Sequence, residues 1–586
     1  MSKLIKYSLV VLLLLGVGLS LLLYRPLDPN SFVMTGGTIL TLDAENSTAE
    51  AVLVRDGKIA AVGRLFEIAK KSADLEIIDL DGATLVPGLI EPHTHPIASA
   101  LLGATVDVSG FKFNDRQSIM TALAEAAGGI GLTPWVIAYG WDPLVVRDLT
   151  VPTLDELDAI SPDKPLFVLT QMMHEGYANS AALKAAGLDI TSKEQIIDGF
   201  PRDSSGKLTG VVREVAAIDR LIKHVPAAPA AATELLTRLQ YIKYAKAGYT
   251  TIGVAGPVGR NADPVGLLKK ISESPESPLR TFTYLLPNQT ESWDLGGNAN
   301  FKIKGVKFWM DGSPFTGGAA MEGNYENTEL VTEKLGLPHN HTGSLNYNRE
   351  EFKAIVLDYH KNGYQIAVHV QGERAVEEVL VAIEDAQTAF PNPDLRHRLE
   401  HNALITHKQL VRLKQLGMTA GFFVDHIYYY GDALPELMGA ARMKRYMPLQ
   451  TAIEAGLKIT VHGDHPATPI DPFRTMKVAV DRLSVSGDTI NGAAEKISRL
   501  DALRALTING AIQLGEQEEI GSIEVGKRAD FTILSENPLS LEASNFYKIE
   551  VIETLKDGRR SDTRLFSLPH VQLVWDILKE KISGGS

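Results

Sequence analysis

The most informative segment of the chain is Leu85-Val86-Pro87-Gly88-Leu89-Ile90-Glu91-Pro92-His93-Thr94-His95-Pro96, an apolar run that ends in two histidines. Side chains two residues apart in a strand point to the same face, so the imidazoles of His93 and His95 would lie together. Two imidazoles on one face form half of a divalent-metal site. The alternative is a pair of strand-end histidines that bind nothing, but the residues downstream favour a metal.

Composition narrows the classes of function. The chain has 586 residues, enough for a large buried core, and its composition carries no signature of disorder. The formal net charge is −13 and no basic stripe is present, which argues against a nucleic-acid partner. Because there is no cysteine, disulfides and thiolate ligands are excluded, and nitrogen and oxygen must hold any metal.

The N-terminal segment resembles a membrane anchor. The run from Tyr7 to Tyr24 carries no charge, and about 18 residues at roughly 1.5 Å each nearly span the hydrocarbon core of a bilayer. A cleaved signal peptide is the alternative, but its small-x-small cleavage site is missing, so we favour an uncleaved signal anchor. Lys3 and Lys6 favour a cytoplasmic N-terminus, which would place the body outside, in a periplasm if the source is Gram-negative.

Strand patterns lie at both ends of the chain. Residues 32–86 alternate short apolar runs with turns at Asp56-Gly57 and Asp81-Gly82, which is typical of a small antiparallel sheet. Residues 521–534 repeat this strand-and-turn pattern near the other end. We therefore predict that the two ends pair into one small β-sandwich.

The middle of the chain alternates strands with helices, as βαβ units do. The predicted strands are 250–254, 280–285, 305–310, 365–370, 398–401, 419–424 and 458–461, and predicted helices include 232–247, 350–362 and 374–389. In a β/α barrel, the active site forms at the C-terminal ends of the strands.

The remaining segments complete the predicted organisation. Residues 311–349 are rich in Gly, Asn and Thr and predict a long loop, a candidate lid. The predicted parts are a signal anchor at 1–30, a composite β-sandwich from 32–86 and 515–562, a metal-binding barrel from 87–112 and 231–514, an insertion subdomain over the barrel mouth at 113–230, and a helical tail at 563–586. The tail either packs on the body, which we favour, or lies on the membrane.

Lys307 lies in the strand Gly305–Met310, which is too apolar to accommodate a free ammonium group. A buried lysine has a lowered pKa and becomes a neutral amine. Such an amine can add carbon dioxide to give a carbamate that bridges two metals. The alternative is a side chain that reaches solvent or pairs with Asp311, and the local sequence alone favours this alternative.

Three further residues end predicted strands. His369 and His401 close successive strand–helix units, which is harder to attribute to chance than one strand-end histidine. Asp464 follows the strand at 458–461 and could ligate a metal and accept a proton from bound water. As an alternative, it is a turn aspartate or a helix cap.

Taken in order, these segments resemble the amidohydrolase superfamily, and in particular its family 3, the YtcJ-like branch. The resemblance covers roughly residues 32–560. Besides the segment around His93 and His95, it rests on Val306-Lys307-Phe308 with Asp311-Gly312, His369-Val370-Gln371-Gly372-Glu373, Arg396-His397-Arg398-Leu399-Glu400-His401, Gly463-Asp464-His465-Pro466, and Gly521 to Asp530.

The resemblance implies an α/β fold with a distorted (β/α)8 TIM-like barrel that holds one or two divalent metals, usually zinc. It assigns His93 and His95 to the first metal, a carboxylated Lys307 to the bridge, and His369 and His401 to the second metal. Asp464 would be a ligand of the first metal and the general base. Family members often have serine at the position of Gly463, and this departure puts a minor contact in doubt.

The expected function is that of a membrane-anchored metallohydrolase that cleaves amide-type C–N bonds, in acyl amides or cyclic amides, with a metal-activated water. An esterase, a peptidase or a deaminase would use much the same centre. From another class, a catalytically silent binding protein is the alternative, and the intact ligand set argues against it.

Three residues of the insertion resemble family segments beside the substrate. They are His174, Arg213 and Glu214, and each either contacts substrate or only stabilises the insertion; Trp141 and Asp142 are weaker candidates. The expected partners are a small-molecule substrate and the membrane through the N-terminal helix, with no nucleic acid. A homodimer is left open.

Overall fold

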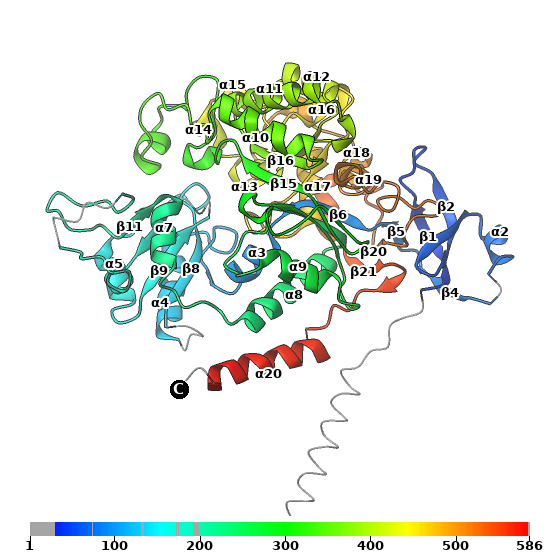
Figure 1. The fold of residues 1–586 in the computed structure, drawn as a ribbon, viewed down its shortest axis with the longest axis horizontal. Helices are drawn as coiled ribbons and strands as arrows, with labels where there is room; N and C mark the ends of the chain where they lie inside the picture. The colour runs from blue at the N-terminus through cyan, green and yellow to red at the C-terminus, as the bar shows by residue number, and fades with distance from the viewer. Residues whose placement is uncertain are drawn as a thin grey trace, which may run out of the picture.

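The computed structural model describes residues 30–583 except 73, 130–133, 172, 174, 192–197 and 566, and only the backbone of 214, 215 and 581–583. Its centre is a barrel of parallel strands (Figure 1). In spatial order these are β6 (Leu89–Thr94), β12 (Tyr249–Ala255), β13 (Arg280–Leu285), β15 (Phe301–Trp309), β16 (Gln365–Val370), β17 (Arg398–His401), β18 (Thr419–Phe422) and β19 (Thr460–Val461). The predicted TIM-like α/β fold is confirmed.

Helices cover the outside of the barrel between these strands (Figure 1). They include α3 (Pro96–Leu102), α8 (Ala230–Lys246), α9 (Pro264–Ser272), α10 (Arg349–Lys361), α11 (Glu373–Ala389), α12 (His407–Gln415), α13 (Asp425–Tyr430) and α17 (Pro472–Asp481). Side chains cap several of them, as Asn348 does for α10 by accepting from the Glu351 N–H at 2.9 Å. The edge strands β6 and β19 are linked by polar contacts, such as that from Gly463 N–H to Glu91 Oε2 at 3.3 Å.

Strands from both chain ends form a single eight-stranded sheet beside the barrel. Its members are β1 (Phe32–Leu40), β2 (Thr48–Arg55), β3 (Lys58–Gly63), β4 (Glu76–Asp79), β5 (Thr84–Pro87), β20 (Phe531–Leu534), β21 (Val551–Lys556) and β22 (Arg559–Arg560). The ends meet where β5 pairs antiparallel with β20. The sheet is mixed rather than antiparallel, because β4 and β5 both run parallel to β1 on either side of the turn at 81–82.

The insertion forms its own five-stranded sheet on one side of the barrel (Figure 1). Its strands are β7 (Val106–Asp107), β8 (Val136–Trp141), β9 (Leu166–Thr170), β10 (Glu175–Ala178) and β11 (Val211–Arg213), with helices α4 (Arg116–Gly128), α5 (Leu154–Ile160), α6 (Ser180–Ala185) and α7 (Glu214–Ile222). It meets the barrel rim where Gln171 Nε2 donates to Ala467 O at 2.9 Å and Tyr430 OH donates to Asp142 Oδ2 at 2.8 Å.

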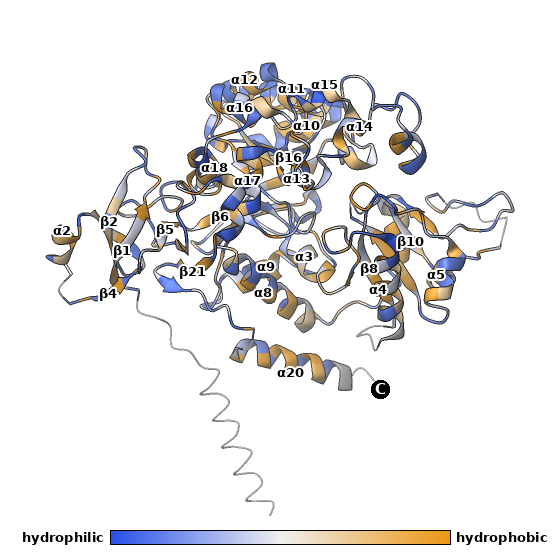
Figure 2. Ribbon diagram, turned by 180° about the vertical axis from the view of Figure 1, so that it is seen from behind, coloured by the Kyte–Doolittle hydropathy of each residue, from blue (hydrophilic) through white to orange (hydrophobic). Residues whose placement is uncertain are grey.

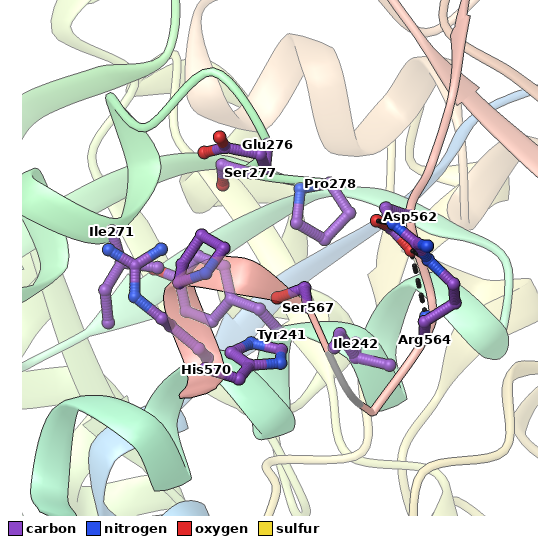
Figure 3. Close-up of a pocket in the computed structure, with 12 residues that line it drawn as sticks. Tyr241, Ile242, Ile271, Glu276, Ser277, Pro278, Asp562, Arg564, Ser567 and His570 are labelled. Atoms are coloured by element: carbon purple, nitrogen blue, oxygen red, sulfur yellow. Dashed lines mark hydrogen bonds and ion pairs between the residues drawn. The ribbon is translucent and has the colours of Figure 1, made fainter. Parts of the chain in front are cut away.

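The C-terminal helix α20 (Leu568–Ser583) lies against α8. His570 is buried in this junction, next to a cavity of about 40 Å³ (Figure 3). The exposed hydrophobic residues of α20 are Leu568, Val571, Val574, Trp575 and Leu578. Figure 2 shows hydrophobic residues along this helix.

The prediction of a single-pass membrane protein has to be corrected. A bilayer core needs about 20 predominantly apolar residues in one helix. Among the residues that the structure describes, no helix is long and apolar enough to cross a membrane. The predicted anchor at 1–30 falls on residues 1–29, which lie outside the described residues. The placement of the body on the far side of a membrane is therefore not retained.

Candidate metal centre

The six predicted metal ligands come from the C-terminal ends of barrel strands, which parallel pairing brings to one end of the barrel. They are His93 on β6, His95 at the start of α3, Lys307 on β15, His369 on β16, His401 at the end of β17, and Asp464 after β19. His401 and Asp464 have left-handed φ angles of 74° and 48°, a conformation that is uncommon for residues other than glycine. Such backbone conformations are concentrated at functional sites.

His93, His95 and Asp464 form the first group. Asp464 Oδ1 lies 3.5 Å from His93 Nε2 and 3.1 Å from His95 Nε2. On the far side of each ring, His93 Nδ1 is 2.6 Å from Glu400 Oε2 and His95 Nδ1 is 3.1 Å from the Gly256 carbonyl. A carboxylate and a carbonyl can only accept, so both Nδ1 atoms donate and a neutral ring has its lone pair at Nε2. Two lone pairs and a carboxylate oxygen then converge, an arrangement that fits a cation.

Electrostatics support these protonation states. Burial, together with the nearby Lys307, lowers the pKa of His93 well below its usual value. Burial acts to raise the pKa of Asp464, but when the facing His93 and His95 rings carry a proton they outweigh burial and hold that pKa well below its usual value. An ionised carboxylate and a neutral imidazole are the forms that bind a metal.

His369 and His401 form a second group beside the first. Their ring centroids are 4.3 Å apart, and the His401 centroid is 4.8 Å from that of His93. Burial and the neighbouring His369 lower the pKa of His401, and its buried Nδ1 makes no hydrogen bond with any described residue. A neutral imidazole with an uncommitted nitrogen is again suited to a metal.

Lys307 neither reaches solvent nor pairs with Asp311. Its side chain is fully buried, and its Nζ has no hydrogen-bond partner among the described residues. Asp311 instead accepts hydrogen bonds from three backbone N–H groups. Burial lowers the pKa of Lys307 to about 8, so a neutral amine is accessible near neutral pH. This environment fits a lysine that is modified to a carbamate.

The predicted substrate residues remain predictions, because the structure shows the surroundings of only some of them. Arg213 lies at the exposed end of β11, where its Nε is 2.9 Å from Glu175 Oε2. His174 lies outside the described residues, as does the side chain of Glu214. Trp141 and Asp142 are buried, and Asp142 accepts the hydrogen bond from Tyr430.

Sequence reasoning missed the buried polar residues around the ligands. Glu400 bonds to His93, and His462 stacks on His93 with ring centroids 4.6 Å apart and an interplanar angle of 12°. Glu91 Oε2 accepts from the Gly463 N–H, next to Asp464. For Glu400, the sequence does contain a signal: Arg398 and Glu400 are opposite charges two residues apart in a buried strand.

Gly463, the one departure from the family pattern, has a local explanation. A Cβ atom at this position would lie 2.4 Å from Cε1 of His465. Real Cβ atoms do not approach other atoms so closely, so the buried His465 ring takes the space that a serine would need.

Two cavities differ in what they could hold. The cavity between α8 and the start of α20 has a volume of about 40 Å³, which is enough for little more than water (Figure 3). A second cavity, of about 760 Å³, lies between the barrel and the insertion, and its lining includes Tyr139, Gln171, His465 and Pro466. The last two directly follow Asp464 in the sequence, but none of the six predicted metal ligands lines this cavity.

Comparison with known proteins identifies the family of the chain. The sequence model of the amidohydrolase family matches residues 76–561. The chain is 28% identical to an N-substituted formamide deformylase of Arthrobacter pascens, covering 90% of this chain and 97% of the relative. It is 26% identical to the putative amidohydrolase YtcJ of Bacillus subtilis, covering 89% and 98%.

Solved structures extend the likeness to the fold. An uncharacterised metal-dependent hydrolase from Pyrococcus horikoshii superposes with a TM-score of 0.69 at 22% identity, covering 88% of this chain and 99% of that one. A second, from Pyrococcus furiosus, has a TM-score of 0.67 at 24% identity, covering 87% and 100%. At these identities the likeness establishes the fold. With the family match it leads to one conclusion: the chain belongs to the amidohydrolase family and is a hydrolase acting on carbon–nitrogen bonds.

Proposed function

We propose that this metal-dependent hydrolase cleaves amide-type C–N bonds, in acyl amides or cyclic amides, with a water molecule activated at the centre around Asp464. The observation that carries the proposal is the convergence of His93 Nε2 and His95 Nε2 on Asp464 Oδ1, with no hydrogen-bond donor among them when both rings are neutral. Partly buried acceptors that face one another without a donor are stabilised by a cation between them.

The ligands divide into two groups. His93, His95 and Asp464 would hold a first divalent ion, His369 and His401 a second, and a carboxylated Lys307 would bridge them. Nitrogen and oxygen donors of this kind suit Zn²⁺. When bound, such a metal lowers the pKa of water from about 15.7 toward about 7 and polarises the substrate carbonyl.

Asp464 is the proposed general base. It is 17% exposed, so it can reach a substrate, and its pKa is held low, so it is ionised at neutral pH. It accepts a proton from the attacking water as the water oxygen bonds to the carbonyl carbon. When the C–N bond breaks, Asp464 passes that proton to the leaving nitrogen. The Gly256 carbonyl orients the neighbouring His95 ring.

The substrate is proposed to be a small molecule that enters at the C-terminal end of the barrel strands, where Asp464 is partly exposed. The chain's similarity to an N-substituted formamide deformylase makes N-substituted formamides the first compounds to test. N-acyl amino acids and cyclic amides extend the panel, and the matching esters test for an esterase.

The test uses the purified full chain, stripped with a chelator and reloaded with Zn²⁺, Co²⁺ or Mn²⁺. We expect metal-dependent hydrolysis of at least one amide class, lost in Asp464→Asn. A metal-loaded protein that hydrolyses no amide in the panel, or only esters, would contradict the proposal. Equal rates for wild type and Asp464→Asn would remove Asp464 from its role.

A further inference from the structure

A fully buried ion pair lies directly behind His93. Arg398 and Glu400 stand two residues apart on β17, and both side chains are 0% exposed. Arg398 Nε donates to Glu400 Oε1, and its Nη2 donates to the Pro92 carbonyl at 2.9 Å. The other carboxylate oxygen, Oε2, accepts from His93 Nδ1 at 2.6 Å. The pair therefore links β17 both to the His93 ring and to the backbone of β6 at Pro92.

We propose that Arg398 and Glu400 are positioning residues that set the tautomer of His93 and thereby the metal affinity of the centre; this rests on the proposed function. Because Arg398 holds Oε1, the carboxylate is fixed with Oε2 toward His93. An Nδ1–H donor is then required on the ring, which leaves the lone pair on Nε2, the atom nearer Asp464. The stacked His462 ring restricts rotation of His93.

Glu400 is not itself placed to bind a metal. Ligand atoms of His93, Glu400 and His462 lie within 4.8 Å of one another, so a second cation site could be considered there. However, each oxygen of Glu400 already accepts a charge-assisted hydrogen bond, and His93 Nδ1 is committed to Glu400. The geometry therefore favours orientation of His93 over direct ligation.

The proposal predicts opposite tautomers for two variants. In Glu400→Gln, Arg398 still requires an oxygen, so the amide NH₂ would turn toward His93 Nδ1. The ring would then accept at Nδ1 and carry its proton on Nε2, where the metal should bind. In the double variant Arg398→Met/Glu400→Gln, nothing holds the amide, so its oxygen can return to His93 Nδ1. The double variant also leaves no uncompensated buried charge.

The test measures Zn²⁺ affinity of folded protein by chelator competition, and the visible absorption of the Co²⁺-loaded forms. We expect Glu400→Gln to lose about 10- to 100-fold in affinity. The double variant should recover most of that loss, although it lacks two charges. Asp530→Asn, which disrupts another buried arginine–carboxylate pair, is the matched control and should keep wild-type affinity.

The outcomes are distinct. If wild type binds no divalent metal, the proposed function fails. If wild type binds metal but folded Glu400→Gln binds equally well, only the positioning role is overturned. Should Glu400→Gln fail to fold, the comparison moves to two charge-free variants, Arg398→Met/Glu400→Gln and Arg398→Met/Glu400→Leu. Only the first retains an acceptor for His93, so equal affinities would overturn the proposal.

Discussion

Two buried arginine–carboxylate pairs, one near each end of the barrel strands, have different roles in the molecule. Arg398 and Glu400 lie behind His93, and Glu400 gives one oxygen to that imidazole. Arg280, the first residue of β13, forms a bidentate pair with Asp530 at 2.8 and 3.1 Å. Asp530 Oδ1 also accepts a hydrogen bond at 2.8 Å from the backbone N–H of Asp557, between β21 and β22.

The difference lies in what the carboxylate contacts besides its arginine. At the C-terminal end of the strands, it contacts a proposed metal ligand. At the N-terminal end, it joins the barrel to the sheet formed by the chain ends. In β/α barrels the C-terminal face carries chemistry and the opposite face carries stability. Substitutions at the two ends should therefore separate activity from stability.

The largest effect is expected at the metal centre itself. Asp464→Asn removes the general base but keeps an oxygen for the cation, so turnover should fall by about 100- to 10,000-fold while most of the metal stays bound. The free energy of unfolding should change little. Initial rates and elemental analysis of the same preparation check this, and near-normal turnover would contradict it.

At the N-terminal end of the strands, a substitution should lower stability and leave the metal centre unchanged. Asp530→Asn removes the bidentate carboxylate from Arg280, which keeps its ion pair with Asp557, so the free energy of unfolding should fall by about 1 to 3 kcal/mol. Metal affinity should be unchanged. Urea unfolding measures the first quantity and chelator competition the second. Asp358→Asn, in an exposed pair with Lys361, is the control and should cost no more than about 0.5 kcal/mol.

Lys556 should make the free energy of unfolding depend on pH. Burial, with the nearby Arg280, lowers its pKa from 10.5 to about 8. Between these values the unfolded chain binds more protons than the folded one, so stability should rise with pH, by at most about 1.4 kcal/mol per unit. Urea unfolding from pH 7.5 to 10 should show this rise in wild type. Lys307, whose pKa is also lowered to about 8, adds a rise of its own, so in Lys556→Met only the part due to Lys556 should vanish. An identical rise in the variant would exclude Lys556 as a source.

The smallest effect is expected at Gly463. Gly463→Ser places a Cβ atom where the His465 ring lies, and overpacking of this kind costs about 1 kcal/mol or slightly more. Because His465 adjoins Asp464, kcat/KM should also fall several-fold. Steady-state kinetics and thermal unfolding measure both. A variant that matches wild type in both would show that the ring moves freely.

The barrel could largely be predicted from the sequence. Strands β13, β16 and β17 have the predicted bounds, because strands buried on both faces appear as continuous apolar runs. The direction of β4 and β5 could not be predicted, since an Asp-Gly turn signals a reversal without stating which strand the chain then joins. The membrane anchor was inferred from a segment that lies outside the described residues.

The candidate site could be predicted only in part. Histidines at strand ends can be recognised in a sequence. That Lys307 Nζ has no hydrogen-bond partner among the described residues cannot, because Asp311 lies nearby in the sequence as a plausible partner. The bond between His93 and Glu400 joins residues 307 positions apart, so no local pattern contains it. The proposed role of Arg213 beside the substrate stays a prediction, since the structure shows only its pair with Glu175.

The most direct test of the central claim is an anomalous diffraction map from crystals of the Zn²⁺-loaded chain, recorded at the zinc absorption edge. We predict a peak about 2.0–2.2 Å from His93 Nε2, His95 Nε2 and an oxygen of Asp464. A loaded, active protein whose only peak lies away from these three atoms would contradict it.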